Sequence, residues 1–400
     1  MSSNQEWITR SDRVFVPTYT RFPAAIVEGK GCRLTDADGK EYLDFLAGIA
    51  VCNLGHCHPT VTAAICAQAG KLTHVSNLFH TQPQTELAEL LLANSFADRV
   101  FLANSGAEAN EAALKLARKH GGPGRYEVIS LLGSFHGRTL ATVAATGQAK
   151  FHQGFEPLPA GFVHAPFGDL PALEKAITQE TCAILCEPLQ GEGGVRPLEL
   201  EYLAGIKALC KKHDLLLIFD EVQVGMGRTG SLFAYEQLGV TPDILTSAKA
   251  LANGLPIGAM LTTDRIAASL GPGTHASTFG GNPIACAAAV ATLKIILADG
   301  FLAEVKQKGD YLAQKLTTLA AKHPELAGGV RGRGLIQGLV LTDEGIAHGP
   351  AIIAALFKEG LLLNFAGNTA LRCIPPLVVS EAEIDEMAAI LDRVLTAKPW

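Results

Sequence analysis

The stretch LLLIFDEVQVGMGRTG (residues 215–230), continued by TPDILTSAKALANG (residues 241–254), decides the fold. Each part begins with or contains an apolar, β-rich run of the kind that forms a buried strand. The first run ends at Asp220, and the second ends at Ser247, two residues before Lys249. A carboxylate and an ammonium group at the ends of buried strands are costly unless each has a partner or an altered pKa. These residues are therefore candidates for a functional site.

The chemistry of this pair points to one cofactor. Ligands of α/β proteins lie at the carboxyl ends of the strands. A lysine at such an end, with an acid placed to hold a cationic ring nitrogen, is the pair that a pyridoxal 5'-phosphate (PLP) enzyme needs. We therefore expect an α/β fold with a PLP site built on Asp220 and Lys249.

Composition narrows the class of protein. The chain has 400 residues, which is enough for two or more domains, and 48% of them are hydrophobic while 18% are charged. This balance is typical of a well-packed enzyme, and a net charge of −6 gives no reason to expect nucleic acid or an anionic membrane as a partner. The sequence shows no apolar span long enough for a transmembrane helix and no signal-peptide pattern, so we expect a cytoplasmic location.

The nine cysteines are scattered, and several lie in apolar runs, which indicates buried reduced thiols rather than disulfides. One cluster has metal-ligating residue types: Cys52, His56, Cys57 and His58. Its spacing matches no standard zinc pattern, and no second pair of ligands follows downstream. We expect a turn with packed histidines and no metal.

The first 50 residues are expected to form short strands and turns, with a β-meander over residues 27–48. Tyr19 and Arg21 flank a turn before this meander, where a loop aromatic and a solvated arginine are the simplest interpretation. Helical periodicity begins at Pro59.

The run RVFLANSGAEANEAALKLARKHG (residues 99–121) predicts a strand, a small-residue turn over residues 105–107 and an amphipathic helix over residues 108–120. A turn that leads into a helix N-terminus can bind an anion, because free backbone N–H groups and the helix dipole point at it. The pattern of a P-loop is absent. An ordinary N-cap at Ser105 is the alternative.

Two later turns also carry polar or aromatic residues at strand ends. Phe135 could stack on a planar ring, and Arg138 could grip a carboxylate, although a packed phenylalanine and a surface arginine are equally compatible with the sequence. A buried strand ends at Glu187, and the following turn contains Glu192. A solvated loop with two surface acids is the alternative there.

Residues 225–230 match the Gly-x-Gly-x-x-Gly pattern of a dinucleotide-binding loop, which raises an NAD-dependent dehydrogenase as a rival function. That fingerprint should open a helix and be followed about 20 residues later by an acid that ends the next strand. Here the next strand leads to Lys249 instead, so we rank the dehydrogenase below the PLP enzyme.

The chain after Lys249 supplies a further strand, a polar loop over residues 275–282 and a long helix. Ser277 and Thr278 could bind phosphate or substrate, or simply cap the helix. From about residue 302 an α+β tail follows, with elements expected at 306–324 (helix), 330–341 (strand), 350–360 (helix), 361–367 (strand) and 381–395 (helix). Arg372 lies in an apolar run, and a buried guanidinium needs an anion, for which Glu192 or a substrate carboxylate would serve.

Eight pieces of the sequence together carry a strong resemblance: GHCHP, SNLFHTQPQTELAELL, NSGAEANEAALKLAR, SFHGRT, EPLQGEGGVRP, FDEVQVGMGRTG, AKALANGLPIGAM and STFGGNP. Over nearly its whole length the chain resembles the class-III (ω-amino-acid) PLP-dependent aminotransferases, and most of all the branch that acts on acetylornithine. The resemblance implies fold type I, as in aspartate aminotransferase. A large α/β/α domain with a mostly parallel sheet (residues 56–290) would be joined by a small α+β domain from both chain ends (1–55 and 291–400).

The resemblance also implies roles around the cofactor. Lys249 would carry PLP covalently, and Asp220 would keep the pyridine nitrogen protonated. Gln223 would bind the phenolic oxygen of the ring, and Phe135 and Val222 would lie on its two faces. The phosphate would be bound by the turn Ser105, Gly106 and Ala107 and by Thr278 of the partner subunit, so that the active unit would be a homodimer with a shared site.

For the substrates, the resemblance implies that Arg138 binds the α-carboxylate, with Ser277 and Tyr19 nearby. Arg372 would bind the carboxylate of 2-oxoglutarate or glutamate. Glu192 would mask Arg372 while the terminal amine reacts, and would swing away for glutamate.

The implied reaction moves the terminal (δ) amino group of N2-acetyl-L-ornithine to 2-oxoglutarate. Its products are N-acetylglutamate 5-semialdehyde and glutamate, in arginine biosynthesis. Ile49 lies where ornithine-specific relatives tend to have a bulky aromatic residue, and with His136 it favours an N-acylated ornithine. Succinylornithine, N-succinyl-diaminopimelate and 4-aminobutyrate remain alternative donors. A non-catalytic protein of the same fold remains a further alternative.

Overall fold

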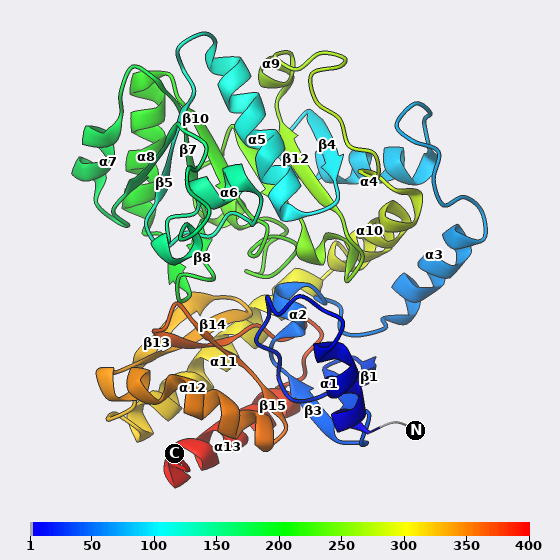
Figure 1. Cartoon of the computed structure of the whole chain (residues 1–400), viewed down its shortest axis with the longest axis vertical. Helices are drawn as coiled ribbons and strands as arrows, with labels where there is room; N and C mark the ends of the chain where they lie inside the picture. Colours follow the sequence, from blue (N-terminus) through cyan, green and yellow to red (C-terminus); the bar gives the residue numbers. More distant parts are fainter. Residues whose placement is uncertain (1–2) are drawn as a thin grey trace.

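The computed structural model of the protein describes residues 3–400. The chain forms a larger α/β domain, drawn mainly in cyan, green and yellow-green in Figure 1, and a smaller α+β domain below it. The smaller domain contains both the first strands of the chain and its last third, because the chain enters the large domain near α3 and leaves it after α10.

A seven-stranded sheet forms the centre of the large domain, in the order β4-β12-β11-β10-β7-β5-β6. The strand β12 is antiparallel to both of its neighbours, and the other strands run in one direction. This confirms the mostly parallel sheet. The strands are β4 (Arg99–Ala103), β5 (Glu127–Leu131), β6 (Phe162–Ala165), β7 (Thr181–Cys186), β10 (Leu216–Asp220), β11 (Ile244–Ser247) and β12 (Gly258–Thr262).

Helices cover both faces of this sheet, which explains why its inner strands are continuous apolar runs. The helix α5 (Gly106–Gly121) packs on one face, and α7 (Leu170–Ala176) and α8 (Leu200–His213) pack on the other (Figure 1). The large domain also contains α3 (Pro59–Ala69), α4 (Gln82–Ala93), α6 (Leu140–Ala145), α9 (Asp264–Ala267), α10 (Pro283–Ile296), the short strands β8 (Leu189–Gln190) and β9 (Arg196–Pro197), and the 3₁₀ turns η1 (Ala149–Phe151), η2 (Ala234–Gln237) and η3 (Lys249–Ala252).

The small domain is built on two four-stranded sheets and a shared apolar core. The meander predicted from the sequence is present, and β15 of the C-terminal part adds to it in parallel with β3, which ties the two ends of the chain together. The elements are β1 (Ile26–Lys30), β2 (Arg33–Asp36), β3 (Glu41–Asp44), α2 (Ala47–Ala50), α11 (Phe301–Lys322), β13 (Ala327–Arg333), β14 (Ile336–Leu341), α12 (Asp343–Lys358), β15 (Leu361–Leu362), β16 (Asn364–Ala366), β17 (Ala370–Cys373) and α13 (Glu381–Ala397).

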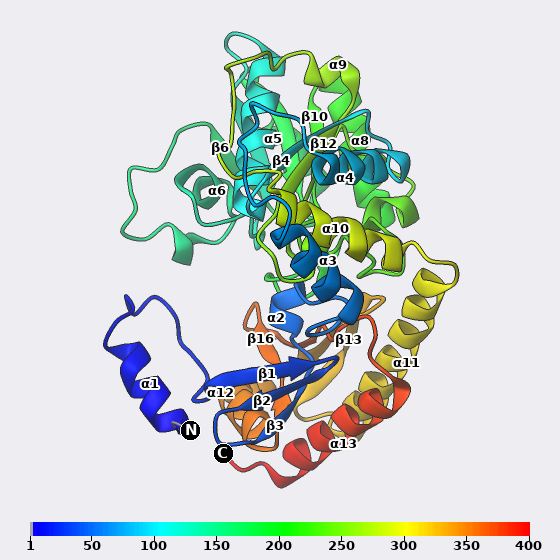
Figure 2. The same ribbon diagram turned by 90° about the vertical axis from the view of Figure 1, so that its right-hand side faces the viewer.

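The expectation of only strands and turns in the first 50 residues is wrong, because α1 (Asn4–Asp12) is a helix. Ser3 and Glu6 form a capping box at its start, yet none of its residues is buried. In Figure 2 this helix stands apart from the rest of the domain. Its sequence lacks the apolar stripe by which amphipathic helices are recognised, which is why periodicity missed it.

Three expected secondary-structure elements of the C-terminal part need correction. The single strand predicted over residues 330–341 is a hairpin of β13 and β14, with a turn at Gly334, whose φ of +54° favours glycine. The helix predicted over residues 350–360 begins earlier, at Asp343, and the strand predicted over residues 361–367 is two short strands. The domain boundary at residue 290 stays a prediction; α10 spans that position, and its last residue, Ile296, packs in an apolar cluster with residues of β4, β11 and β12.

Within residues 3–400, no single helix is long and apolar enough to cross a bilayer. The helices α10 and α11 reach the necessary length and composition only when taken as a pair, and this pair is bent by 73°.

Candidate active site

The sheet register brings Asp220 and Lys249 to the same edge. Asp220 is the last residue of β10, and Lys249 comes two residues after the end of the neighbouring parallel strand β11. Asp220 pairs in register with Thr246. The carboxyl ends of adjacent parallel strands therefore place the two charged residues side by side, as the sequence predicts.

Asp220 is buried and accepts three hydrogen bonds. The Nδ1–H of His136 and the side-chain amide of Asn110 each donate to Oδ2 at 2.8 Å, and the backbone N–H of Val222 donates to Oδ1 at 3.0 Å. Thr246 donates to the amide oxygen of Asn110 at 2.7 Å, which fixes the orientation of that amide. Within residues 3–400, no lysine or arginine forms an ion pair with Asp220.

Lys249 begins η3 with a φ of +46°, a backbone conformation that costs energy for a residue other than glycine. Burial lowers the pKa of its amine, while the nearby carboxylate of Glu192 opposes that shift and Arg372 adds to it. A lysine with a lowered pKa is neutral in a larger fraction of molecules and can act as a nucleophile or a base.

The turn before α5 lies against the Asp220 loop. Ser105 caps the helix, because its hydroxyl accepts the backbone N–H of Glu108 at 3.2 Å. A Cβ on Gly106 would lie 2.7 Å from a methyl group of Val222, so only glycine fits there. The structure thus brings the predicted phosphate-binding turn next to the residue predicted to cover one face of the ring.

Glu187, directly after β7, is a further buried carboxyl group at this edge. It accepts the backbone N–H groups of Phe135 at 3.1 Å and of Gly191 at 3.4 Å. Burial, and next the negative charge of Asp220, hold the pKa of Glu187 well above its usual range. Through these contacts Glu187 positions the loop that carries Phe135.

Arg372 of β17 reaches this edge from the small domain. Its Nη1 donates to Glu192 Oε1 at 2.7 Å and to Gln223 Oε1 at 2.8 Å, and its Nε donates to Asn364 at 3.1 Å. The amide of Gln223 also donates to Glu192, at 3.1 Å. Burial opposes the ionisation of Glu192, but Arg372 and Lys249 outweigh it and lower the pKa of Glu192 to about 2. The predicted pairing of Glu192 with Arg372 is present.

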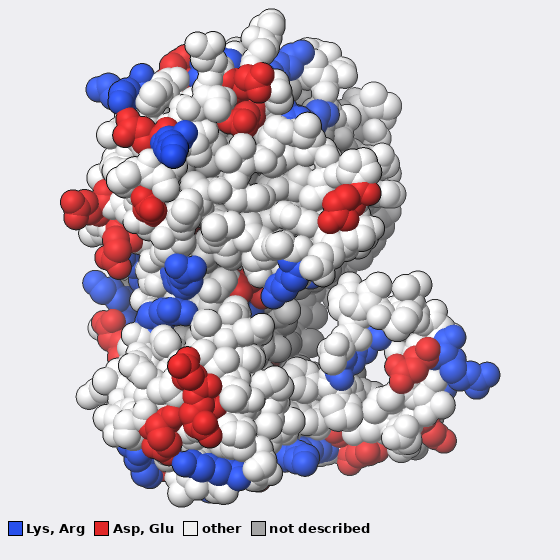
Figure 3. Space-filling view, turned by 60° about the vertical axis from the view of Figure 1, so that its left-hand side comes forward, with Lys and Arg blue, Asp and Glu red and all other residues white. Residues whose placement is uncertain are grey.

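Arg138 follows His136 by two residues and has a different environment from Arg372. It is exposed, and its guanidinium lies 4.2 Å from the ring centroid of Phe151 and 5.4 Å from that of Phe135. In the space-filling view, basic and acidic side chains line the hollow between the two domains (Figure 3).

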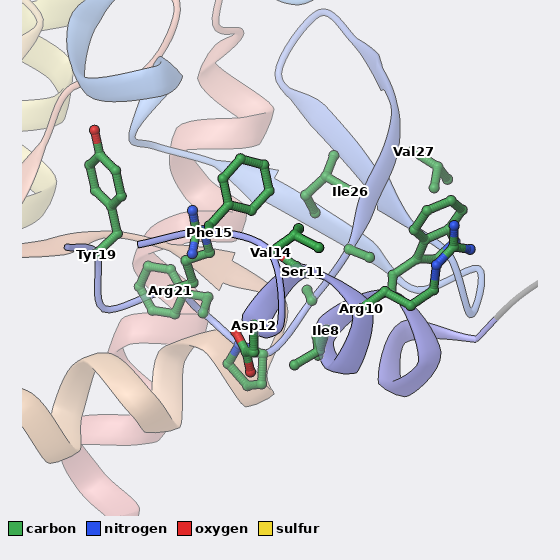
Figure 4. Close-up of a pocket in the computed structure, with 15 residues that line it drawn as sticks. Ile8, Arg10, Ser11, Asp12, Val14, Phe15, Tyr19, Arg21, Ile26 and Val27 are labelled. Atoms are coloured by element: carbon green, nitrogen blue, oxygen red, sulfur yellow. The ribbon is translucent and has the colours of Figure 1, made fainter. Parts of the chain in front are cut away.

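Three predicted site residues are not brought to the Asp220 edge by any contact within residues 3–400. Thr278 is exposed and lines a small depression with residues 74–84. Ser277 accepts a hydrogen bond from Asn104 at 3.1 Å, so it lies beside the turn that precedes α5. Tyr19 is 74% exposed and lines the cavity of Figure 4 together with residues of α1 and β1, and no contact joins it to Asp220 or Lys249 within residues 3–400. Arg21 lies 5.4 Å from the ring of Tyr19.

Sequence reasoning missed the residues that hold Asp220. Asn110 is buried on α5 among Ala109, Ala112 and Ala113. A polar residue within an apolar helix face is a signal that could have singled it out, since buried amides need partners. His136 was noticed only as a neighbour of Phe135, because no local pattern shows that its ring meets Asp220 84 residues later.

Comparisons with known proteins agree with this geometry. A family model described as Aminotransferase class-III matches residues 14–395. The chain belongs to the class-III aminotransferases. An acetylornithine aminotransferase of Myxococcus xanthus is 52% identical to this aminotransferase over 391 residues, 96% of each chain. One of Caldanaerobacter subterraneus subsp. tengcongensis is 48% identical, over 97% of this chain and 99% of its own.

Solved structures share the fold of this class-III aminotransferase. Ornithine aminotransferase of Toxoplasma gondii ME49 has a TM-score of 0.94 and 33% identity, covering 100% of this chain and 96% of its own. N-acetylornithine aminotransferase of Stenotrophomonas maltophilia K279a has a TM-score of 0.84 and 37% identity, covering 98% and 99%. A further Toxoplasma gondii structure is described with PLP at partial occupancy in its active site. The protein is a PLP-dependent transaminase of fold type I.

The residues of this class-III aminotransferase fit PLP. Asp220 is a buried carboxylate held by His136, Asn110 and a backbone N–H, with no lysine or arginine partner within residues 3–400, so a protonated ring nitrogen would supply the charge it lacks. The N-terminus of α5 lies beside it and suits a phosphate. Lys249 supplies an amine with a lowered pKa.

The glycine-rich loop of residues 225–230 serves domain packing. A Cβ on Gly227 would lie 2.9 Å from Leu377, and the buried Arg228 donates to the carbonyl oxygen of Leu335 at 2.8 Å and to that of Pro375. The loop therefore joins the two domains, and the dehydrogenase alternative is excluded by the family.

Proposed function

We propose that the protein transfers the terminal amino group of N2-acetyl-L-ornithine to 2-oxoglutarate. The observation that carries the proposal is a pair of arginines: Arg138 has no carboxylate partner within residues 3–400, and Arg372 is paired with Glu192. Such a pair suits two successive substrates, one with a single carboxylate and one with two. The names of the curated relatives at 52% and 48% identity support the same substrate.

In this proposal Lys249 carries the cofactor and moves the proton. PLP, when bound, stabilises negative charge on the substrate carbon that bears the amino group and keeps that group between the half-reactions. The amine of Lys249, whose pKa burial lowers, would take the proton from that carbon. Asp220, held by His136 and Asn110, would provide the fixed negative charge that holds the ring nitrogen. Gln223 would bind the phenolic oxygen of the ring, and Phe135 and Val222 would lie on its faces.

The two arginines then divide the substrates. Arg138 would bind the α-carboxylate of the N-acylated ornithine, whose terminal amine reaches Lys249. During this half-reaction Glu192 would keep Arg372 neutralised, as the 2.7 Å contact supports. For glutamate or 2-oxoglutarate, Glu192 would move away and Arg372 would bind the second carboxylate.

Ile49 supports an acylated substrate. It lies in α2, between the two domains in Figures 1 and 2, and its φ of +65° is a strained conformation for a β-branched residue. Its side chain is partly exposed and cannot donate or accept a hydrogen bond. An acylated α-nitrogen, unlike a free ammonium, carries no charge and so needs no charged partner at this position.

We also propose a homodimer in which Thr278 of the partner subunit completes the phosphate site. In one subunit Thr278 lies on an exposed surface together with Leu78, which is 85% exposed, and the exposed rings of Phe79 and Phe279. Apolar surface of this kind is typical of an interface. The segment of Figure 4 adds exposed Val14 and Phe15, which line a cavity of about 810 Å³ together with Tyr19. Tyr19 would reach its site only with a neighbour in place. The nine free cysteines support a reducing compartment, for which we propose the cytoplasm.

One spectrum tests the central assignment. Purified protein with added PLP should show a visible absorbance band that bleaches on addition of N-acetylornithine and returns on addition of 2-oxoglutarate. Lys249→Ala should lose the band that depends on the covalent link and should not turn over. A wild-type protein without any visible band, or a Lys249→Ala variant with an unchanged one, would show that Lys249 does not carry the cofactor.

The donor is tested separately by a panel with 2-oxoglutarate as acceptor. N-acetylornithine should give the highest kcat/KM, above succinylornithine, N-succinyl-diaminopimelate, 4-aminobutyrate and free ornithine. A higher value for any other donor would replace acetylornithine in the proposal while leaving the cofactor roles in place.

A further inference from the structure

Phe151, the last residue of η1, lies against Arg138 in a way that no assigned role explains. The guanidinium of Arg138 is 4.2 Å from the centroid of the Phe151 ring, closer than the 5.4 Å to Phe135. The two rings meet edge to face, with centroids 5.6 Å apart and planes at 78°. The ammonium of Lys150 lies 4.9 Å from the same Phe151 ring. Phe151 therefore contacts the cationic groups of both Arg138 and Lys150.

An aromatic ring holds a guanidinium without using its hydrogen-bond donors. The attraction comes from the negative face of the ring, so all the N–H groups of the arginine remain available. Arg138 forms no hydrogen bond or ion pair with any residue in the range 3–400. A carboxylate in place of Phe151 would occupy those donors and cancel the charge that a substrate carboxylate needs.

Phe151 is also well anchored to the loop that carries Phe135. The amide of Gln148 donates to the carbonyl oxygens of Gly133 at 3.2 Å and Ser134 at 3.0 Å. The backbone N–H of Phe151 donates to the carbonyl oxygen of Gln148 at 3.0 Å. These bonds fix the position of Phe151 relative to the two residues that precede Phe135, so its ring can define where the Arg138 side chain lies.

We propose that Phe151 is a positioning residue for the substrate carboxylate and acts through Arg138. This inference rests on the proposed role of Arg138. Removal of the ring would leave the charge of Arg138 intact but free its long side chain to adopt other rotamers, and ordering it again would weaken substrate binding. The proton transfer at Lys249 takes place at the other end of the substrate, so kcat would change little.

The test compares three variants of the PLP-loaded protein. Phe151→Leu should raise the KM for N-acetylornithine about fivefold, the effect expected from a partly exposed cation–π contact, with kcat nearly unchanged. Phe151→Tyr keeps the ring face and should restore the KM. Phe155→Leu is the matched control, since Phe155 is 58% exposed in the same loop and has no aromatic or cation contact within residues 3–400. Glutarate, which has two carboxylates and cannot react, should bind Phe151→Leu about fivefold more weakly by calorimetry.

The Arg138→Gln background separates the possible failures. If Arg138→Gln raises the KM and Phe151→Leu has no further effect in that background, the proposal is supported. If Arg138→Gln raises the KM but Phe151→Leu alone does not, or if both effects add in full, the role of Phe151 is overturned while Arg138 keeps its own. If Arg138→Gln leaves the KM unchanged, both assignments are overturned. An unchanged KM with a weakened visible band in Phe151→Leu would show that the ring supports only Phe135.

Discussion

Arg138 and Arg372 would receive the carboxylates of the same substrates, yet the two domains hold them by different means. Arg138, in the large domain, is exposed and rests on the rings of Phe135 and Phe151. Arg372, in the small domain, is fully buried and bonded to Glu192. A guanidinium on aromatic rings is always ready for an anion, whereas one paired with a carboxylate is available only when that carboxylate leaves. The difference suits one carboxylate present in every substrate and a second present in only some.

Replacement of Arg372 should lower the stability of the protein more than any other change described below, because Arg372 is ion-paired with the partly buried Glu192. Arg372→Gln would leave the partly buried carboxylate of Glu192 without its cation, and we expect a loss of about 3 kcal/mol of stability, the lower end for a broken buried ion pair. Thermal unfolding should show a clearly lower midpoint, and the KM for 2-oxoglutarate should rise. An unchanged midpoint would mean that Glu192 finds another partner or solvent.

Replacement of Arg138 should cost activity but no stability. Arg138→Gln loses a charge-assisted bidentate contact with the substrate, which corresponds to an about 100-fold lower kcat/KM for N-acetylornithine. Since Arg138 forms no ion pair within residues 3–400, the unfolding midpoint should stay at the wild-type value. A fall in stability equal to that of Arg372→Gln would remove the contrast between the two arginines.

Removal of Glu192 should leave Arg372 without a carboxylate partner, as Arg138 already is within residues 3–400. Glu192→Ala would expose Arg372 permanently, so turnover of glutamate should rise severalfold relative to that of the terminal amine. Single-turnover measurements of each half-reaction would give the ratio, with Glu201→Ala as a control at an exposed glutamate on α8. Equal changes in both half-reactions would contradict a switch.

The pH dependence of the pair should be the smallest effect. The pKa of Glu192 is lowered to about 2 from an ordinary value of 4.5, so its ionised form stabilises the fold above the ordinary value and this contribution is lost as the pH falls towards 2. The midpoint difference between the wild type and Glu192→Ala should therefore be constant around neutral pH and shrink only below about pH 4.5. A difference that already shrinks at neutral pH would show that Glu192 is not held ionised by Arg372.

Most of the regular fold could be predicted from local patterns. Apolar runs and turn residues, which act within a few positions, predict the meander of β1 to β3 and the strand–turn–helix around Ser105. They also predict the strand end at Asp220 and the position of Lys249 just after β11. The exceptions have local causes too. The helix α1 lacks an apolar face, and the hairpin of β13 and β14 reads as one strand because its turn depends on the single positive φ of Gly334.

The residues of the site also divide into those that local sequence patterns predict and those that only tertiary contacts bring together. The sequence by itself determined which residues end the buried strands and therefore which side chains reach the edge of the sheet: Asp220, Lys249, Glu187, Phe135 and Arg138. Only the tertiary structure decided what each of them meets. Asn110 and His136 reach Asp220 across 110 and 84 residues of chain, and Gln223 reaches Arg372 across 149. Such contacts depend on sheet register and on the packing of one domain against the other, and neither leaves a periodic trace in the sequence.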